Sequence, residues 1–208
     1  MKHLTAEAYI ADPCGASSLS YRKTTELHVP DSVMIVRDDA FCGVPEGLTD
    51  TVYFKLRHNL RNLQPAPVPD GYSIVHADTA AFARHINACY SSEGVTPGEL
   101  ERYKEHDAYR AYLWIALQSN RTGEIAATGI AEIDASIGEG TLEWIQASPA
   151  HRRRSLGRWT VNELLCRMRD EAAFATVSGR ADNPTDPFGL YRRCGFTDPV
   201  YWHIIKEV

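Results

Sequence analysis

The sequence predicts a mixed α/β domain over residues 71–208, preceded by an extension and linker over residues 1–70. Three observations lead to this prediction. Residues 64–71 are rich in proline, which is typical of a linker rather than of a buried helix or strand. After the linker, apolar residues recur with strand and helix periods in the order β-α-α-β-β-β-α-β-α-β. Within that order, an apolar strand, a basic loop and an amphipathic helix follow one another between residues 142 and 172.

The composition is that of an ordinary globular chain. It has 208 residues, of which 44% are hydrophobic and 24% charged, and a formal net charge of −5. An acidic chain gives no general electrostatic reason to bind nucleic acid or an anionic membrane. No apolar stretch is long enough to span a bilayer, and no signal peptide is evident. Five cysteines without a CxxC pair favour reduced thiols and a cytoplasmic location.

Residues 1–63 are the hardest part of the chain to interpret. A short helix is predicted over residues 4–11 and a strand over residues 32–36. Residues 51–62 fit two patterns, because apolar side chains recur there both at alternate positions and at helical spacing. We favour a helix for the second half of this segment.

The elements after the linker follow from periodicity and capping. Asp78 is predicted to cap one helix, and Thr96-Pro97-Gly98-Glu99 starts a second with a capping box and a proline at its first position. A third helix follows the basic loop, and a fourth spans residues 184–193. Glycines 138 and 140 are expected to form a turn. The predicted strands are 72–77, 111–117, 124–134, 142–147, 175–180 and 200–205.

The basic loop has the features of an anion site. Arg152, Arg153 and Arg154 precede Gly157, and a helix with an apolar face follows directly. The first amides of a helix lack an internal partner, and the helix dipole places partial positive charge there. A pyrophosphate could therefore bind the amides between Arg153 and Arg158. The alternative is that the three arginines form a basic patch exposed to solvent. Arg153 fits this alternative best.

Two motifs in this element order resemble the GNAT superfamily of acetyl-CoA-dependent N-acetyltransferases. The family's phosphate loop, (Gln/Arg)-x-x-Gly-x-(Gly/Ala) after Val-x-Pro, is similar to residues 152–157 after Ala147-Ser148-Pro149. Its second signature is an asparagine after a strand and then Tyr-x-x-x-Gly-Phe, which matches Asn183 and residues 191–196. The resemblance covers about residues 72–205 and implies a mostly antiparallel central sheet flanked by helices.

The resemblance also implies how acetyl-CoA, the expected acetyl donor, would bind. Backbone groups of Ile145 and Ala147 would pair with the pantetheine arm as if it were an added strand. Asn183 would hydrogen-bond the pantetheine amides, although a strand-ending cap explains this asparagine equally well. The residues implied around the pyrophosphate are Arg152, Arg153, Arg154, Ser155, Leu156, Gly157 and Arg158.

Two side chains take catalytic roles by the same resemblance. Tyr191 has the family's general-acid position, since a phenol with a pKa of about 10 stays protonated at neutral pH and can donate to a thiolate. A core aromatic is the structural alternative. Glu143 is the candidate base, because strand alternation puts it on the face of Ile145 and Ala147 and burial could raise its pKa. A structural ion pair for Glu143, with a water chain to bulk solvent taking the proton, is the competing interpretation.

Other residues depart from the family pattern or suggest further sites. Ser155 stands where the loop has its first glycine, so its side chain could clash at a positive φ or donate to a phosphate oxygen. Tyr112, Trp114 and Trp144 could line an acceptor pocket, although aromatics in central strands more often belong to the core. The histidines show no metal-binding spacing, so no metal is expected. His151 is predicted to face solvent.

The sequence therefore predicts an N-acetyltransferase in which a primary amine attacks the donor directly in a ternary complex. The acceptor is expected to be a small molecule or a peptide, and the net charge weakly favours a cation such as a polyamine or an aminoglycoside. A non-catalytic CoA-binding or regulatory module is the alternative, and a donor such as succinyl-CoA fits the same loop. A monomer and a homodimer both fit. The extension could cover the acceptor site, supply a dimer surface or fold as a degenerate second half, and it is predicted to pack on the acceptor side.

Overall fold

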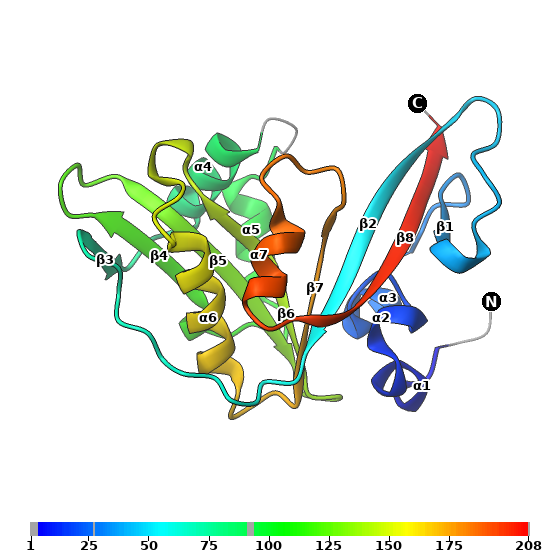
Figure 1. Cartoon of the computed structure of the whole chain (residues 1–208), viewed down its shortest axis with the longest axis horizontal. Coiled ribbons are helices and arrows are strands. Elements are labelled where there is room, and N and C mark those ends of the chain that lie inside the picture. Colours follow the sequence, from blue (N-terminus) through cyan, green and yellow to red (C-terminus); the bar gives the residue numbers. More distant parts are fainter. Residues whose placement is uncertain (1–3, 27, 91–93, 208) are drawn as a thin grey trace. The chain divides into compact units, whose positions relative to one another are not determined.

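The computed structural model describes residues 4–26, 28–90 and 94–207 (Figure 1). The chain forms two compact units. The first, here called the composite unit, combines residues 1–59 with residues 174–208. The second, the contiguous unit, spans residues 60–173. No helix in the described part of the chain is long and apolar enough to cross a membrane.

In the contiguous unit, the described strands form an antiparallel sheet in the order β3-β4-β5-β6. The strands are β3 (Tyr72–Val75), β4 (Trp114–Ser119), β5 (Ile125–Asp134) and β6 (Glu139–Ala147). The helices are α4 (Thr79–Cys89), α5 (Pro97–Lys104) and α6 (Leu156–Met168), with the 3-10 turns η2 (Ala111–Leu113) and η3 (Pro149–His151).

Helices cover both faces of β5, which is buried at every position except its two ends. Ile130 lies on one face, in a core with Phe82 of α4 and Leu100 of α5. Its neighbour Gly129 lies on the other face against α6, since a Cβ there would come within 2.4 Å of the Thr160 side chain. The glycine lets α6 approach the sheet closely, and this positions the loop that precedes the helix.

The predicted caps of α4 and α5 are confirmed. The Asp78 side chain accepts a hydrogen bond from the N–H of Ala81. At α5, the Thr96 hydroxyl accepts from the N–H of Glu99, and the Glu99 carboxylate accepts from the N–H of Thr96. Because each cap involves residues three positions apart, a local sequence signal was enough to locate both helix starts.

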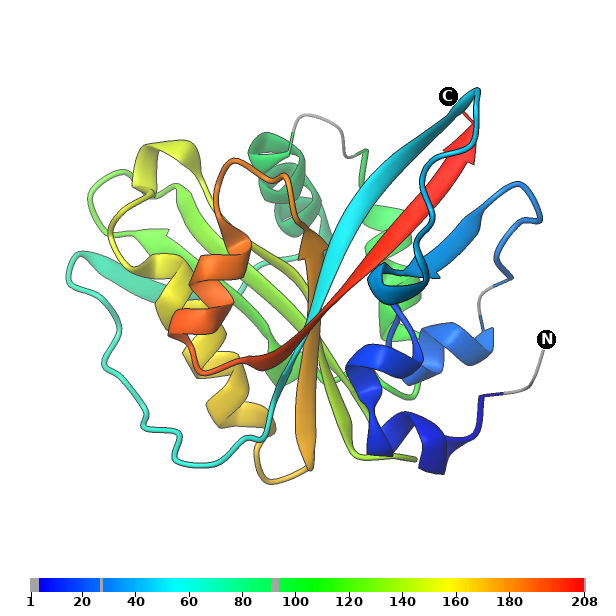
Figure 2. The ribbon, with the colours of Figure 1, turned by 45° about the vertical axis from the view of Figure 1, so that its right-hand side comes forward.

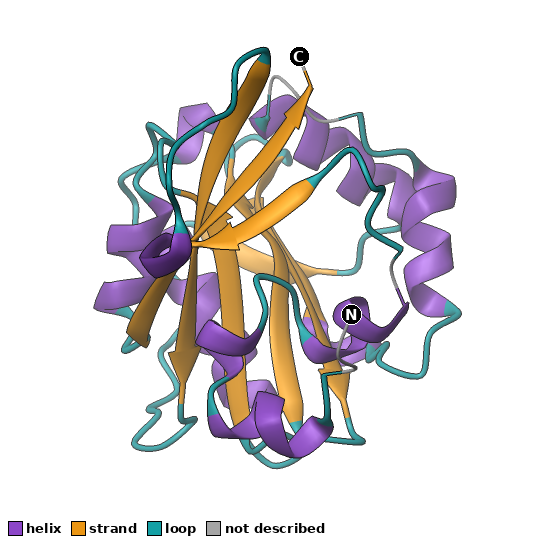
Figure 3. Ribbon diagram, turned by 90° about the vertical axis from the view of Figure 1, so that its right-hand side faces the viewer, coloured by secondary structure: helices purple, strands orange, loops and turns teal. Residues whose placement is uncertain are grey.

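In the composite unit, strands from both ends of the chain pair in the antiparallel order β1-β8-β2-β7. Figure 2 shows β2 (cyan) and β8 (red) running side by side, and Figure 3 shows the same strands in orange. The strands are β1 (Met34–Arg37), β2 (Leu48–His58), β7 (Phe174–Arg180) and β8 (Thr197–Glu207). The helices are α1 (Ala6–Ala11), α2 (Pro13–Ala16), α3 (Tyr21–Glu26), α7 (Pro187–Arg193) and the 3-10 turn η1 (Asp38–Ala40).

The helix favoured for the second half of residues 51–62 is wrong. Residues up to His58 belong to β2, which pairs with β7 along one edge and with β8 along the other. Phe54 and Leu56 are completely buried in this strand. The segment is compatible with both periods, and pairing on two sides favours the strand because it satisfies the backbone hydrogen bonds along both edges.

Two boundaries in the contiguous unit also differ from the sequence prediction. The strand expected from Ala111 begins only at Trp114, because the preceding residues form η2. Gly140, expected in a turn, lies inside β6. A Cβ at Gly140 would come within 2.4 Å of Met168 Sδ, so the glycine serves close packing of α6 rather than a turn.

A buried lysine of β2 holds the N-terminal helices in the composite unit. Lys55 is 1% exposed, and its ammonium donates hydrogen bonds to Tyr9 Oη at 2.8 Å and to Ser17 O at 3.0 Å. The Leu19 carbonyl is a third acceptor, and the Tyr9 ring centroid lies 4.7 Å from the ammonium. Oxygen acceptors thus compensate the burial of the charge and tie this N-terminal segment to β2.

The proline-rich linker has neither helix nor strand over residues 60–69 and contacts α6. Trp159 Nε1 donates to Ala66 O at 3.1 Å, and Asn162 Nδ2 donates to Gln64 O at 2.9 Å. The division into an extension of residues 1–70 and a domain of residues 71–208 stays a prediction. The structure adds that β2 of the extension is an internal strand between β7 and β8.

Candidate active site

The candidate base lies at a bulge in β6. Between Leu142 and Trp144 the register with β5 shifts by one residue, so Glu143 is the extra residue of a β-bulge. Strand alternation alone predicts that Glu143 shares a face with Ile145, but the bulge interrupts this alternation. Glu143 is partly buried at the bulge, so strand parity no longer supports it as the candidate base, and that role stays a prediction.

The backbone edge of β6 that faces away from β5 presents Ile145 and Ala147. The N–H of Ser148 donates to Ala126 O of β5 at 2.9 Å, and alternate residues of an antiparallel strand face the same partner. Ile145 and Ala147 therefore direct their backbone groups away from β5, which is the orientation that pairing with an added strand requires.

Side chains already approach both of these carbonyl groups. Tyr90 Oη donates to Ile145 O at 3.2 Å, and Arg152 Nε donates to Ala147 O at 3.4 Å. These hydrogen bonds show that the edge accepts donors from outside the sheet. A ligand that paired with β6 would share the two carbonyls with Tyr90 and Arg152 or displace these side chains.

The loop before α6 contains two residues in the left-handed region. After η3, Arg153 has φ 59° and Ser155 has φ 61°. Ser155 occupies the N-cap position of α6, yet its side chain makes no capping hydrogen bond. The glycine position of the family loop thus has the positive φ that was considered from the sequence, and a serine adopts it at a cost of about 1–2 kcal/mol.

The surroundings of the loop are cationic. Arg152, Arg153, Arg154 and Arg158 are all exposed. The first turn of α6 has no acidic residue, so the helix dipole and the arginines favour the same ligand charge. A helix N-terminus with exposed arginines has the donor chemistry that fits a diphosphate. Contacts of residues 152–158 with such a group stay a prediction.

The prediction that His151 faces solvent is wrong. Its side chain is buried, and Nδ1 lies 2.9 Å from Tyr72 Oη. The reason is the turn η3, which directs this ring inward to the first strand of the contiguous unit. His151 therefore anchors the loop to β3.

A buried polar network connects α4 with β5 and β6. His85 Nδ1 lies 2.9 Å from Thr128 Oγ1, which also accepts a hydrogen bond from Gln146 Nε2. Cys89 Sγ lies 3.8 Å from His85 Nε2. Burial lowers the pKa of His85 to about 4 and raises the pKa of Cys89. A thiol with a raised pKa is a poor nucleophile at neutral pH, so the Cys89–His85 pair is structural rather than catalytic.

Tyr191 and Asn183 belong to the composite unit, whereas the other predicted site residues belong to the contiguous unit. Tyr191 lies on α7 and is 6% exposed, with its ring centroid 5.6 Å from that of Phe196. Asn183 follows β7, and its Oδ1 accepts from the N–H and the hydroxyl of Thr185, at 3.0 and 2.8 Å. Asn183 thus makes the strand-ending turn that was the alternative to pantetheine binding.

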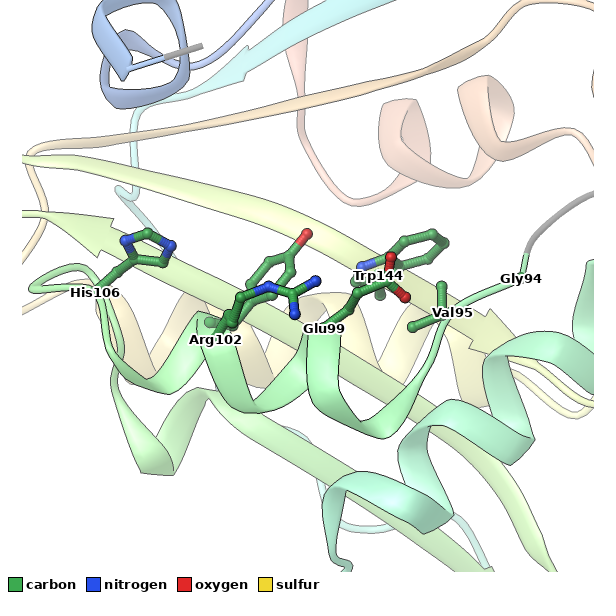
Figure 4. A pocket seen from close by; sticks show the side chains of 7 residues that line it. Gly94, Val95, Glu99, Arg102, His106 and Trp144 are labelled. Carbon is green, nitrogen blue, oxygen red and sulfur yellow. The ribbon is translucent and has the colours of Figure 1, made fainter.

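A cavity of about 420 Å³ lies between α5 and β6 in the contiguous unit (Figure 4). Trp144 lines it, as one of the three aromatics suggested from the sequence, whereas Tyr112 and Trp114 are not among its lining residues. Trp114 packs on Phe82, and the Tyr112 hydroxyl donates to Glu171. The other side chains that line the cavity are Val95, Glu99, Arg102, Tyr103 and His106.

Within the described ranges, no three His, Cys, Asp or Glu side chains are grouped so that they could hold a metal ion.

The β6 strand, the cationic loop and the start of α6 combine, on a mixed α/β fold, the features expected of a site for a diphosphate-containing group. The chain belongs to the GNAT acetyltransferase family, because the family model described as "Acetyltransferase (GNAT) family" matches residues 79–196. The family, and the mixed fold with a mostly antiparallel sheet flanked by helices, are thereby confirmed. Among curated proteins, none matches the chain in sequence.

Solved structures share the fold at low sequence identity. A GCN5-related N-acetyltransferase from Sphaerobacter thermophilus matches with a TM-score of 0.66 and 18% identity, over 77% of this chain and 53% of that one. A GCN5-related N-acetyltransferase from Kribbella flavida gives 0.54 and 18%, over 84% and 67%. A tandem GNAT protein from the clavulanic acid biosynthesis pathway gives 0.56 and 16%, over 76% and 53%. This chain thus spans about half the length of the first and third structures.

Tyr90 and Arg102 lie at the candidate site although no local pattern set them apart as site residues. Tyr90 follows α4 and bonds to Ile145 of β6, and Arg102 is one of several charged residues of α5. Packing of the helices against β6 brings both residues to the site, and this packing is not visible in local sequence patterns.

Proposed function

We propose that this chain transfers an acetyl group from acetyl-CoA to a primary amine, by direct attack of the amine in a ternary complex. Membership of the GNAT acetyltransferase family supports acetyl transfer in general. The observation that carries the proposal is the loop before α6, where exposed arginines surround a helix N-terminus and β6 turns backbone groups outward beside it. The acceptor is taken to be a small molecule or a peptide.

Different residues of this chain bind different parts of acetyl-CoA in this proposal. The amides at the start of α6 and the arginines of residues 152–158 hold the diphosphate, with Arg153 the most dispensable of them. Ile145 and Ala147 pair with the amide-bearing arm through their backbone. Asn183 donates a hydrogen bond to this arm through its side-chain amide nitrogen, because its Oδ1 already accepts hydrogen bonds from Thr185. When bound, acetyl-CoA supplies the acetyl group as an activated thioester.

Two side chains move protons in the proposed reaction. The amine nitrogen forms a bond to the acetyl carbon while the bond from that carbon to sulfur breaks. Glu143 takes the proton that the nitrogen loses, directly or through water, and Tyr191 donates a proton to the departing thiolate. Tyr191 has this role by its place in the family motif, and it lies buried on α7.

The test is calorimetric titration with acetyl-CoA, using two tryptophan variants at equivalent helix positions. Gly157 is the second residue of α6 and Gly98 is the second residue of α5. A Cβ at Gly98 meets no atom within 4 Å, so Gly98→Trp is a control for the substitution itself. We expect Gly157→Trp to abolish binding and Gly98→Trp to retain it. No binding by the unmodified chain at millimolar acetyl-CoA would overturn the proposal.

Turnover is measured separately, by mass spectrometry of acetylated products from a panel of amines. We expect Tyr191→Phe and Glu143→Gln to keep acetyl-CoA affinity and to lower turnover about 10²-fold or more, as for other general acids and bases. Acetyl-CoA binding without acetylation of any amine would favour the alternative, a non-catalytic CoA-binding module.

A further inference from the structure

The cavity beside Trp144 contains a cation, Arg102, whose charge acts on the neighbouring carboxylate of Glu99. Arg102 is exposed on α5, and its guanidinium makes no hydrogen bond or ion pair with any residue that the structure describes. Arg110 and Arg167 of the same unit, by contrast, are bonded to Glu171 and Glu163 at 2.9 and 2.8 Å. In Figure 4 the Arg102 side chain lies on the cavity side of α5. It is therefore available to a ligand in the cavity.

A single carboxylate lies beside this cation. Glu99 is three residues before Arg102, so the two side chains are neighbours on one face of α5. Hydrogen bonds from the backbone N–H and from the hydroxyl of Thr96 lower the pKa of Glu99, which keeps the carboxylate ionised at neutral pH. The cavity thus presents one negative and one positive charge a short distance apart.

The remaining walls combine aromatic and aliphatic side chains with the imidazole of His106. The Trp144 ring packs against Tyr90, with ring centroids 6.0 Å apart, and Val95 and Tyr103 complete the apolar lining. A volume of about 420 Å³ is within the usual range for small-molecule sites. The cavity is suited to an apolar or aromatic group of modest size with charged groups at one end.

We propose that the acceptor is an amine that also carries a carboxylate, on an apolar or aromatic body, and that Arg102 binds this carboxylate. The proposal rests on the proposed acetyl transfer and specifies its substrate class. Glu99 attracts the ammonium form of the acceptor, which releases one proton to water before its nitrogen attacks the acetyl carbon. Trp144 with Tyr103 contacts the apolar body of the acceptor. An amino acid with an apolar side chain is the simplest molecule of this kind.

The charges of the cavity oppose the polycationic acceptor that the net charge weakly favoured. A polyamine or an aminoglycoside needs several carboxylates, and among the described lining residues Glu99 is the only one. Arg102 would repel a second positive charge. The overall acidity of the chain is thus a poor guide to the substrate, because most acidic residues in the described ranges lie outside this cavity.

The experiment compares acceptors that differ only in the carboxylate. Acetylation of L-leucine is measured against 3-methylbutylamine, and L-phenylalanine against 2-phenylethylamine, with spermidine as the polycation. The variants are Arg102→Gln and Arg102→Lys. Arg84→Gln is the matched control, because Arg84 is an exposed helical arginine of the same unit that does not line the cavity. Calorimetry of each acceptor with the unmodified chain gives binding independently of turnover.

We expect the two amino acids to be used in preference to their decarboxylated partners. Arg102→Gln should raise KM for the amino acids about tenfold or more, as loss of a hydrogen bond between charged groups does, with little change in kcat. It should change KM for the decarboxylated amines less than about threefold, Arg102→Lys should be intermediate, and Arg84→Gln should have no effect.

Equal use of amino acids and decarboxylated amines would overturn the proposal while leaving acetyl transfer intact, as would preference for spermidine. An equal effect of Arg102→Gln on both members of each pair would also overturn it. Binding of the amino acids in an Arg102-dependent way without acetylation would support the ligand class and contradict the proposed acetyl transfer. Absence of amino acid binding and of amino acid acetylation would remove the proposal altogether.

Discussion

The two units of this chain are built from different kinds of sequence. The contiguous unit uses one unbroken segment, residues 60–173, and its strands pair with neighbours along the chain. The composite unit combines residues 1–59 with residues 174–208, and β2 lies between β7 and β8. Its pairs join residues such as Tyr53 and Arg180.

This difference explains where sequence-based reasoning succeeded. In the contiguous unit, caps and apolar periods act over a few residues and indicate most of the elements, although the start of β4 and the place of Gly140 were predicted wrongly. In the composite unit, the nature of β2 depends on strands more than a hundred residues later, so the local pattern of residues 51–62 is ambiguous. The predictions that follow test how far the two units differ, from the largest expected effect to the smallest.

Removal of residues 1–59 should have the largest effect. Without β2, both β7 and β8 lose their main partner, whereas the strands of the contiguous unit keep theirs. Hydrogen exchange measured by mass spectrometry should show protection in residues 174–207 reduced about 100-fold or more, with residues 114–147 much less affected. Cleavage at a protease site inserted in the linker after folding is the control, because β2 then stays paired. Unchanged protection of β7 and β8 in the truncated chain would contradict the prediction.

Lys55→Ala should destabilise the composite unit strongly. The change removes a buried ammonium and leaves the Ser17 and Leu19 carbonyls without this donor. We expect a loss of roughly 3 kcal/mol in the free energy of unfolding, measured with urea. Lys206→Ala in β8, an exposed lysine of the same unit, should change it by less than about 0.5 kcal/mol. A similar small change for both variants would show that the buried lysine is dispensable.

Two histidines should give the units opposite pH dependence. Burial lowers the pKa of His85 in the contiguous unit to about 4, below the value of about 6.5 in an unfolded chain. The unfolded state then binds more protons between these values, so stability is full above about pH 6.5 and falls by up to about 3 kcal/mol as the pH drops to 4. His85→Gln should flatten this part of the profile of urea stability against pH.

His203 in the composite unit should act with the opposite sign. Burial opposes its protonation, but hydrogen bonds to Asp50 at 2.6 Å and to Asp38 at 3.1 Å outweigh this and raise the pKa of His203. Its contribution is full below about pH 6.5 and is lost as the pH rises through the raised pKa. His203→Gln should therefore destabilise the chain more at pH 6 than at pH 9. A larger loss of stability at pH 9 than at pH 6 would contradict the raised pKa of His203.

Ser155→Gly should have the smallest effect. The glycine removes the cost of a left-handed serine at φ 61°, but it also increases the backbone entropy of the unfolded chain. These terms are similar in size, so the free energy of unfolding should change by less than about 1 kcal/mol. Acetyl-CoA affinity, measured by calorimetry, should be equal or modestly higher. Loss of affinity on this change would show that the serine hydroxyl contacts the phosphate.

Within the candidate site, features set by neighbouring residues could be predicted, and features set by distant segments could not. Residues 147–157 form a contiguous motif in which the order strand, loop and helix already implies exposed arginines at a helix N-terminus. The orientation of His151 could not be predicted, because it depends on Tyr72 of a strand far away in the sequence. The bulge at Glu143 could not be predicted either, because it depends on the register between β5 and β6.

The sequence by itself determined the family, the starts of α4 and α5 and the cationic loop before α6, because each depends on residues within a few positions of one another. Only the tertiary structure decided that residues 48–58 form an internal strand, that His151 is buried and that Arg102 lines a cavity with Trp144. The physical reason is that strand pairing, burial and cavity shape arise from contacts between distant segments. Such contacts leave no periodic signal in the residues that make them.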